Sequence, residues 1–183
     1  MDLLQMLMDA QEGQAVQQLG KSVGLGQDDA ASAVKNLLPA LAAGLKRNTS
    51  QQGGPEGLMG ALSGGSHQRY LDEPASLSSE ATIKDGNGIL GHLLGSKDVS
   101  RQVAARASAK TGIGADVLKK MLPLVAAMAM GGLSKQAKSG ALGSASQAGK
   151  GGLLDMLTPM LDSDKDGSVV DDVMGMLGKT FGR

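Results

Sequence analysis

Apolar residues recur three and four positions apart along much of the chain, which is the spacing of one face of an α-helix. Two such rows stand out: Val16, Leu19 and Val23, and then Val99, Val103 and Ala107. A short apolar stretch precedes each row, at 2–9 and at 89–94. The pattern therefore predicts two pairs of helices, each with a short apolar helix followed by an amphipathic one.

These helix pairs belong to a duplicated segment. The stretch "KSVGLGQDDAASAVKNLLPALAAGL" (21–45) is similar to "KTGIGADVLKKMLPLVAAMAMGGL" (110–133), with four residues fewer between the glycine turn and the proline in the second copy. The turns "GLG" and "GIG" suit a helix C-terminus, because glycine readily adopts the left-handed conformation found there. Acidic residues follow each turn, as expected in the first turn of a helix. Each copy is thus predicted to be one helical unit.

Pro39 and Pro123 lie inside the last apolar stretch of the two copies. Proline lacks an amide donor and collides with the preceding helical turn. We therefore expect a kink or a break at both prolines, each of which would open a second segment. That segment is apolar almost all round, which predicts that it is buried against its repeat partner.

Composition favours the same fold class. Hydrophobic residues make up 41% of the chain, but aromatic residues only 1%, so Ala, Leu and the 11 Met must fill the interior. These residues are strong helix formers. The chain has no cysteine, which excludes disulfides, thiol nucleophiles and cysteine-based zinc sites. We predict an all-α, multi-helical fold with a duplicated unit and a C-terminal helix–loop–helix element.

Five segments follow from these patterns. We expect a first helical repeat at 1–47 and a second at 89–138. A Gly/Ser-rich linker would join them at 48–88, with a single helical turn around "GLMGAL". A flexible linker at 139–152 would then connect the second repeat to the C-terminal helix–loop–helix at 153–183.

The stretch "LDSDKDGSVVDDV" (161–173) has the spacing of a calcium-binding loop. Aspartates occupy the first, third and fifth positions, Gly167 supplies the sixth-position turn, and the seventh position offers a backbone carbonyl. Position twelve is Val173 instead of the usual glutamate, so a shortened loop or a differently placed helix would have to bring in Asp172 from position eleven. The predicted Ca²⁺ ligands are Asp162, Asp164, Asp166, Ser168 and Asp172.

A helix cap is the alternative interpretation of the same stretch. Ser168 and Asp171 have the spacing of a capping box at a helix N-terminus. Capping leaves Asp162 and Asp164 unexplained, because they repel Asp166 unless a cation neutralises them. Both interpretations stay open from the sequence.

The charges are unevenly distributed although the formal net charge is zero. Counting Lys and Arg against Asp and Glu, residues 1–95 carry −4, residues 96–150 carry +7 and residues 151–183 carry −3. The basic segment 97–138 could bind an anionic partner, or it could attract the acidic ends of the same chain. Without aromatics for base stacking, a nucleic-acid partner is not expected, and a solvated helix face is the favoured interpretation.

Catalytic motifs are not supported. "GKS" (20–22) resembles the end of a phosphate-binding loop, but Ala15 stands where that motif needs a glycine. His67 is expected on a loop surface and His92 within a helix, and neither has the partners of a catalytic base. We therefore expect a non-enzymatic structural or interaction protein, with a protein partner or self-association.

The N-terminus "MDLLQMLMDA" lacks the basic start of a secretory signal. The longest apolar run, at 121–133, is too short to span a bilayer and contains proline and glycine. We expect no transmembrane segment and a cytoplasmic location.

Three stretches resemble a known family. "GILGHLLG" (88–95), "KTGIGADVLKKMLP" (110–123) and "LDSDKDGSVVDDVMGMLG" (161–178) are similar to a bacterial family of unknown function related to the YidB-like all-helical proteins. The resemblance implies a multi-helical fold and brings no biochemical activity with it.

Overall fold

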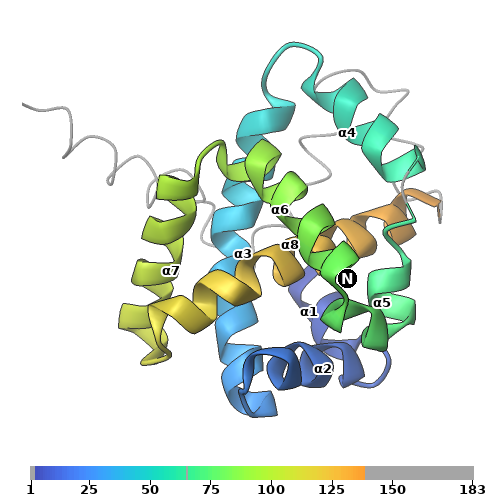
Figure 1. Cartoon of the computed structure of the whole chain (residues 1–183). Helices are drawn as coiled ribbons and strands as arrows, with labels where there is room; N and C mark the ends of the chain where they lie inside the picture. The colour runs from blue at the N-terminus through green and yellow to red at the C-terminus, as the bar shows by residue number, and fades with distance from the viewer. Residues whose placement is uncertain (1–2, 65, 139–183) are drawn as a thin grey trace, which may run out of the picture.

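The regular elements of the protein are helices throughout the part described by its computed structural model, residues 3–64 and 66–138 (Figure 1). In chain order they are α1 (Leu3–Asp9), α2 (Gln14–Val23), α3 (Gln27–Thr49), α4 (Gly54–Gly64), α5 (Arg69–Asp72), the 3₁₀ helix η1 (Pro74–Ser78), α6 (Glu80–Leu94), α7 (Lys97–Thr111) and α8 (Ala115–Lys138). The predicted all-α fold is confirmed for these residues. The predicted linker 139–152 and the C-terminal element 153–183 lie outside them.

The two long helices, α3 and α8, form the centre of the molecule, and the other helices pack around them. One continuous apolar core runs from Leu3 to Leu133. Every residue of α8 from Met121 to Ser134 is buried. By length and composition alone Ala115–Ala137 could cross a membrane, but 83% of its 18-residue apolar window is buried in protein. Such burial is that of the core helix of a soluble protein.

The contacts between helices follow the duplication. Exchanging α1 with α6, α2 with α7 and α3 with α8 turns each contact among these six helices into another observed contact. For example, α6 packs on α3 just as α1 packs on α8. The short helices of each copy therefore contact the long helices of both copies.

Both predicted glycine turns are present. Gly24 ends α2 with φ 78° and Gly112 ends α7 with φ 76°, and both donate a backbone hydrogen bond to the preceding turn. Residues other than glycine rarely adopt this backbone conformation.

The expected breaks at the prolines are wrong, because α3 continues through Pro39 and α8 through Pro123. Buried residues on both sides of each proline hold the helix in place, and such packing supplies most of the stability of helices in proteins. Pro123 is buried as expected, whereas Pro39 is exposed.

The segment 48–88, expected to be a linker, is mostly helical. It contains α4, α5, η1 and the first turns of α6, which starts at Glu80 instead of residue 89. Its Gly- and Ser-rich composition is typical of a linker, but a few of its apolar and aromatic side chains are buried in the core and hold the segment in place: Leu58, Leu62, Tyr70, Leu71 and Leu77. Ser79 caps α6 by accepting a hydrogen bond from the Thr82 amide, which explains the early start of that helix.

Candidate functional site

A polar cluster joins α5 to α6. The hydroxyl of Tyr70 donates a 2.6 Å hydrogen bond to Oδ2 of Asp85. Nη2 of Arg69 lies 3.3 Å from the same carboxylate oxygen and 3.2 Å from the Tyr70 hydroxyl. The Arg69 guanidinium also lies 5.0 Å from the centroid of the Tyr70 ring, within cation–π distance. Because Tyr70 is only 1% exposed, the cluster holds a core aromatic residue in place.

The electrostatics of this cluster suit a structural link. Burial, together with the hydrogen bond to Asp85, raises the pKa of the Tyr70 phenol, while Arg69 opposes the shift. The phenol is therefore protonated at neutral pH and acts as a hydrogen-bond donor. A proton donor fixed between two charged groups ties α5 to α6, which is a role in stability rather than in bond making.

His67 lies beside the cluster, with its ring centroid 6.0 Å from that of Tyr70. Its Nδ1 atom is buried and has no hydrogen-bond partner among the described residues. Burial lowers the pKa of the imidazole and Arg69 adds to the effect, whereas Asp85 opposes it. His67 lies in the turn before α5, as expected for a loop residue, but it is only partly exposed, and its backbone carbonyl packs closely against Gly131 of α8.

The other two candidates lie in helices, as the sequence predicted. Lys21 of the "GKS" stretch is inside α2 and points to Gln17, so this stretch does not form a phosphate-binding loop. His92 lies in the last turn of α6 and is exposed. Its backbone carbonyl accepts a hydrogen bond from Asn48 of α3.

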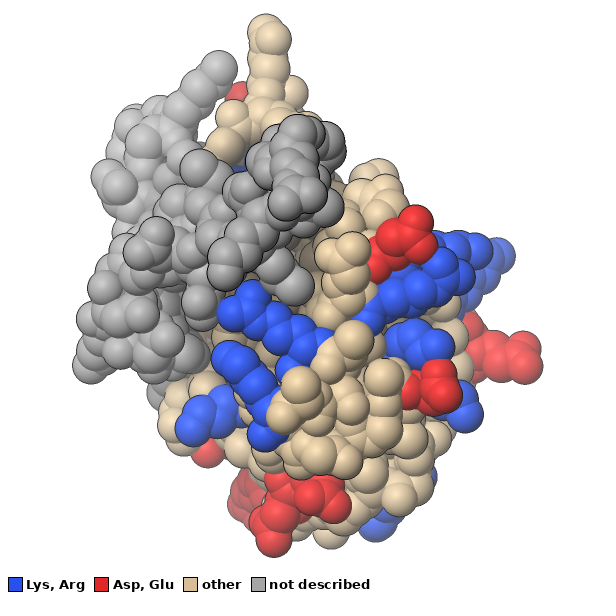
Figure 2. Space-filling view, turned by 90° about the vertical axis from the view of Figure 1, so that its left-hand side faces the viewer, with Lys and Arg blue, Asp and Glu red and all other residues tan. Residues whose placement is uncertain are grey.

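Basic side chains gather on the side of the molecule where α7 lies. Figure 2 shows Lys and Arg across the middle of this side, with few Asp or Glu among them. We define the basic face by its exposed members on α7 and at the start of α8 and by two residues at the end of α3: Lys97, Arg101, Lys110, Lys119, Lys120, Lys46 and Arg47. Arg47 joins the end of α3 to the end of α6, because its Nη2 atom donates to the Leu93 carbonyl at 3.1 Å, shortly before α7 begins at Lys97.

The helical period arranges the basic residues of α7 in two rows. At about 100° per residue, Lys97 and Arg101 lie on one flank of the helix, and Arg106 and Lys110 lie on the other. The crest between the rows carries small or neutral exposed side chains at Gln102, Ala105 and Ala109, together with Asp98. The outer side of α7 is thus a mostly uncharged strip, interrupted by Asp98, with positive charge on both sides.

The ion pairs on the basic face leave its cations accessible. Arg101 pairs with Asp98 at 2.6 Å, yet 65% of the Arg101 side chain is exposed. Lys119 pairs with Asp116 at 2.6 Å, and its side chain is 44% exposed. Exposed pairs of this kind contribute about 0–1 kcal/mol, so these side chains can change partners at little cost.

Comparison with protein families assigns the helical body. A family model described as "Bacterial protein of unknown function (DUF937)" matches residues 5–136. The chain belongs to this bacterial family. Comparison with curated proteins and with solved structures found no match.

The DUF937 match covers the described body almost completely, including the polar cluster and the basic face. It ends before the acidic stretch 161–173, so the predicted calcium ligands are not part of the matched region. Asp162, Asp164, Asp166, Ser168 and Asp172 also lie outside the described residues, so their geometry stays a prediction. Within residues 3–64 and 66–138, no group of three or more His, Asp or Glu could hold a metal ion.

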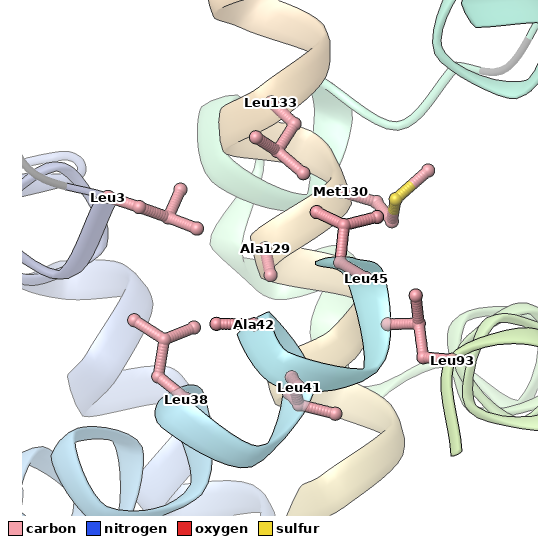
Figure 3. Close-up of a pocket in the computed structure, with 9 residues that line it drawn as sticks. All are labelled: Leu3, Leu38, Leu41, Ala42, Leu45, Leu93, Ala129, Met130 and Leu133. Atoms are coloured by element: carbon pink, nitrogen blue, oxygen red, sulfur yellow. The ribbon is translucent and has the colours of Figure 1, made fainter. Parts of the chain in front are cut away.

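A small cavity lies between α3 and α8, where α1 and α6 also approach (Figure 3). It has a volume of about 10 Å³, close to the lower limit for a single water molecule. Its lining is entirely apolar: Leu3, Leu38, Leu41, Ala42, Leu45, Leu93, Ala129, Met130 and Leu133. A cavity of this size and lining is a packing gap in the core of the DUF937 body, far smaller than the roughly 300 Å³ of a small ligand site.

Proposed function

We propose that this DUF937 protein is a non-enzymatic interaction protein that binds an anionic partner through its basic face. One observation carries this proposal: α7 presents two rows of positive charge at the surface, and Arg47 at the end of α3 is held beside the junction of α6 and α7 by its hydrogen bond to the Leu93 carbonyl. Concentrated positive charge of this kind attracts anionic groups and accelerates their association.

Exposed apolar residues are a weaker basis for partner binding than the basic face. Among the described residues, Ile83 stands out as a large exposed apolar side chain, and it is 40% exposed. It lies on α6, whose buried residues include Leu90. Isolated apolar residues of this kind are normal on soluble proteins. Charge is therefore the better candidate for recognition by this body.

The basic face can be tested with heparin as a polyanionic probe. We expect Lys97→Glu/Arg101→Glu and, separately, Lys119→Glu/Lys120→Glu to elute from heparin at lower salt than the unchanged chain. Losing two contacts should lower the slope of log affinity against log salt by roughly two, since each contact contributes about 0.9 on duplex DNA.

The matched control is Lys21→Glu/Lys84→Glu, which makes the same change in charge at exposed residues of α2 and α6. It should elute like the unchanged chain apart from the small effect of net charge. Equal losses in all three variants would show that only net charge matters and would refute a specific basic face.

A second candidate function is Ca²⁺ binding by the C-terminal element. The supporting observation is the spacing of Asp162, Asp164, Asp166 and Gly167, which matches the first half of a calcium loop. Ser168 would add its carbonyl and Asp172 its carboxylate. We also propose a cytoplasmic location, with which the mostly buried α8 is consistent. Kinship with the YidB-like proteins is likewise a proposal.

Calorimetric titration of the metal-stripped full chain tests the calcium site. Because only the folded loop would offer this geometry, excess Ca²⁺ should stabilise that element and raise its melting temperature. At a Ca²⁺ concentration of 100 times Kd, the stabilisation free energy should be about 2.7 kcal/mol. Asp162→Ala or Asp164→Ala should abolish the binding heat, whereas Asp171→Ala should largely preserve it. Mg²⁺ should substitute poorly because it holds its water more tightly. Absence of heat at millimolar Ca²⁺ would leave this stretch as a capped helix start.

A further inference from the structure

We propose that the anionic partner of the basic face is the acidic segment 161–172 of the same chain. This inference rests on the proposed function and names its partner. The segment would bind along α7, between the two basic rows, and would occupy the surface that a separate polyanion would need.

Charge complementarity is the first support. The segment "LDSDKDGSVVDD" contains five aspartates and one lysine, a net charge of −4. Helix α7 contains four basic residues and one acidic residue, a net charge of +3, and Lys46 and Arg47 lie at the adjacent end of α3. At physiological ionic strength exposed charges attract one another only within about 8 Å. The attraction therefore requires the segment to lie directly on the face.

The shape of α7 is the second support. Its outer crest carries Ala105 and Ala109, whose small side chains let another chain approach the helix closely. The long side chains of Lys97 and Arg101 on one flank and Lys110 on the other can reach over such a chain. When the segment is extended, Asp162, Asp164 and Asp166 line one face, because side chains at alternate positions point the same way, and can meet one basic row. Asp171, at an odd position, points to the other face and toward the other row.

The length of the chain allows this contact. Helix α8 has 24 residues, so it is about 36 Å long, and it runs from the end beside α7 to the opposite side of the molecule (Figure 1). Residues 139–160 number 22, and this stretch can span up to about 70 Å when extended. The acidic segment can therefore return along the full length of α8 to the basic face.

A tethered partner also has an advantage over a free one. Short tethers give effective concentrations in the mM range. A weak electrostatic contact with a Kd of about 1 mM is then occupied about half of the time or more. Binding of Ca²⁺ by the same aspartates would reduce the charge of the segment from −4 to −2 and should release it.

Paramagnetic labelling of the full chain tests the proposal. The chain has no cysteine, so Ser163→Cys accepts a single nitroxide label. In metal-free buffer at low salt, the amide signals of Lys97–Lys110 should lose about half of their intensity or more, as expected for a contact occupied at least half of the time. Signals of α5, which lies on the opposite side of the molecule from α7 in Figure 1, should keep theirs. In about 1 M salt, where screening acts over about 3 Å, the α7 signals should recover.

Charge reversal supplies the matched comparison. Lys97→Glu/Arg101→Glu should restore the α7 signals at low salt, and Lys21→Glu/Lys84→Glu should leave them broadened. Unbroadened α7 signals, or broadening that survives both salt and charge reversal, would overturn the proposal. In a mixture, nitroxide-labelled chains without ¹⁵N can be combined with ¹⁵N chains that carry no nitroxide. Broadening of the ¹⁵N signals in this mixture would make a second copy the partner and would also overturn the proposal.

The outcomes separate this inference from the proposed function. Heparin binding without broadening of α7 would keep the basic face as an anion-binding surface and reject the acidic segment as its partner. Conversely, if the contact forms, Asp162→Asn/Asp164→Asn should strengthen heparin retention of the full chain, because the face is then vacated. If calorimetry shows that the chain binds Ca²⁺, adding Ca²⁺ should restore the intensity of the α7 signals. Signals that stay broadened with Ca²⁺ bound would refute the release of the segment by Ca²⁺.

Discussion

His67 is the residue at which the core of this protein is most directly coupled to pH. Its Nδ1 atom is buried beside Tyr70, and its backbone carbonyl faces Gly131 of α8. Burial lowers the pKa of the folded imidazole below the ordinary value of 6.5. The unfolded chain therefore binds this proton more readily than the folded chain, and folding becomes less favourable as the imidazole is protonated.

The sign of this effect gives a prediction. The contribution of His67 to stability is intact above pH 6.5 and decreases as the pH falls from there to the lower pKa of the folded state. The protein should melt at a lower temperature at pH 5.5 than at pH 7.5, and His67→Gln should reduce this difference. The effect should be below about 1 kcal/mol, because water screens a partly exposed imidazole. His92→Gln, which replaces the other histidine of the chain at an exposed position, is the matched control, and equal changes in both variants would contradict the role of His67.

Features of single residues can be predicted from the sequence where their cause lies in a few neighbouring positions. The glycine turns at Gly24 and Gly112 were predicted because a helix end needs a left-handed residue, which is a property of a few neighbouring positions. The link from Tyr70 to Asp85 was missed because its residues are fifteen positions apart and meet only after α5 packs on α6. The only tyrosine of the chain, in an otherwise polar stretch, was the available signal for it.

Close approach of the backbones determines how α6 lies on α8. Gly86 is buried, and a Cβ atom placed there would collide with the backbone carbonyl of Pro123. Gly44 of α3 stands in the same relation to the Leu93 carbonyl at the other end of α6. Both contacts involve backbone atoms, which cannot move aside as the end of a flexible side chain can.

Two alanine substitutions in α6 separate packing from helix propensity. Gly86→Ala should destabilise the protein by about 1–3 kcal/mol, because the added methyl group forces the helices apart. Gly88→Ala should instead stabilise it by about 0.5–1 kcal/mol, since alanine is the better helix former and nothing lies within 4 Å of the new atom. Urea unfolding of both variants measures the difference. Equal effects of the same sign would show that α6 does not approach α8 this closely.

Predictability also differed between the helices. The rows of α2 and α7 were read correctly because an amphipathic pattern has a clear period. The sequence pattern did not predict α5 and η1 and predicted α4 only as a single turn around "GLMGAL", because each is held by one or two buried residues such as Leu62 or Leu77. The continuity of α3 and α8 was missed because the intrinsic penalty of Pro39 and Pro123 is offset by packing, which a local rule does not include. For the candidate site, composition located the basic segment, but only the structure adds Lys46 and Arg47 from α3.

At the scale of the whole molecule, the duplication has produced one structure instead of two. The short helices of each copy contact the long helix of the other copy as well as their own, so α1 and α6 each pack on both α3 and α8. The apolar core correspondingly runs without interruption from Leu3 to Leu133. Neither copy buries its own apolar residues without the other, which is the usual condition for stable repeats.

This shared core predicts a single cooperative unfolding transition of the body. Leu37 of the first copy and Leu122 of the second are both fully or almost fully buried, at 0% and 1% exposure. Leu37→Ala and Leu122→Ala should each lower the free energy of unfolding by about 2–5 kcal/mol. Because the copies unfold together, either change should weaken the hydrogen-exchange protection of the slowest amides in both α3 and α8 by the same amount. The measurement is native-state exchange followed by NMR in the full chain. Loss of protection restricted to the mutated copy would mean that the two halves are independent folding units joined by a contact.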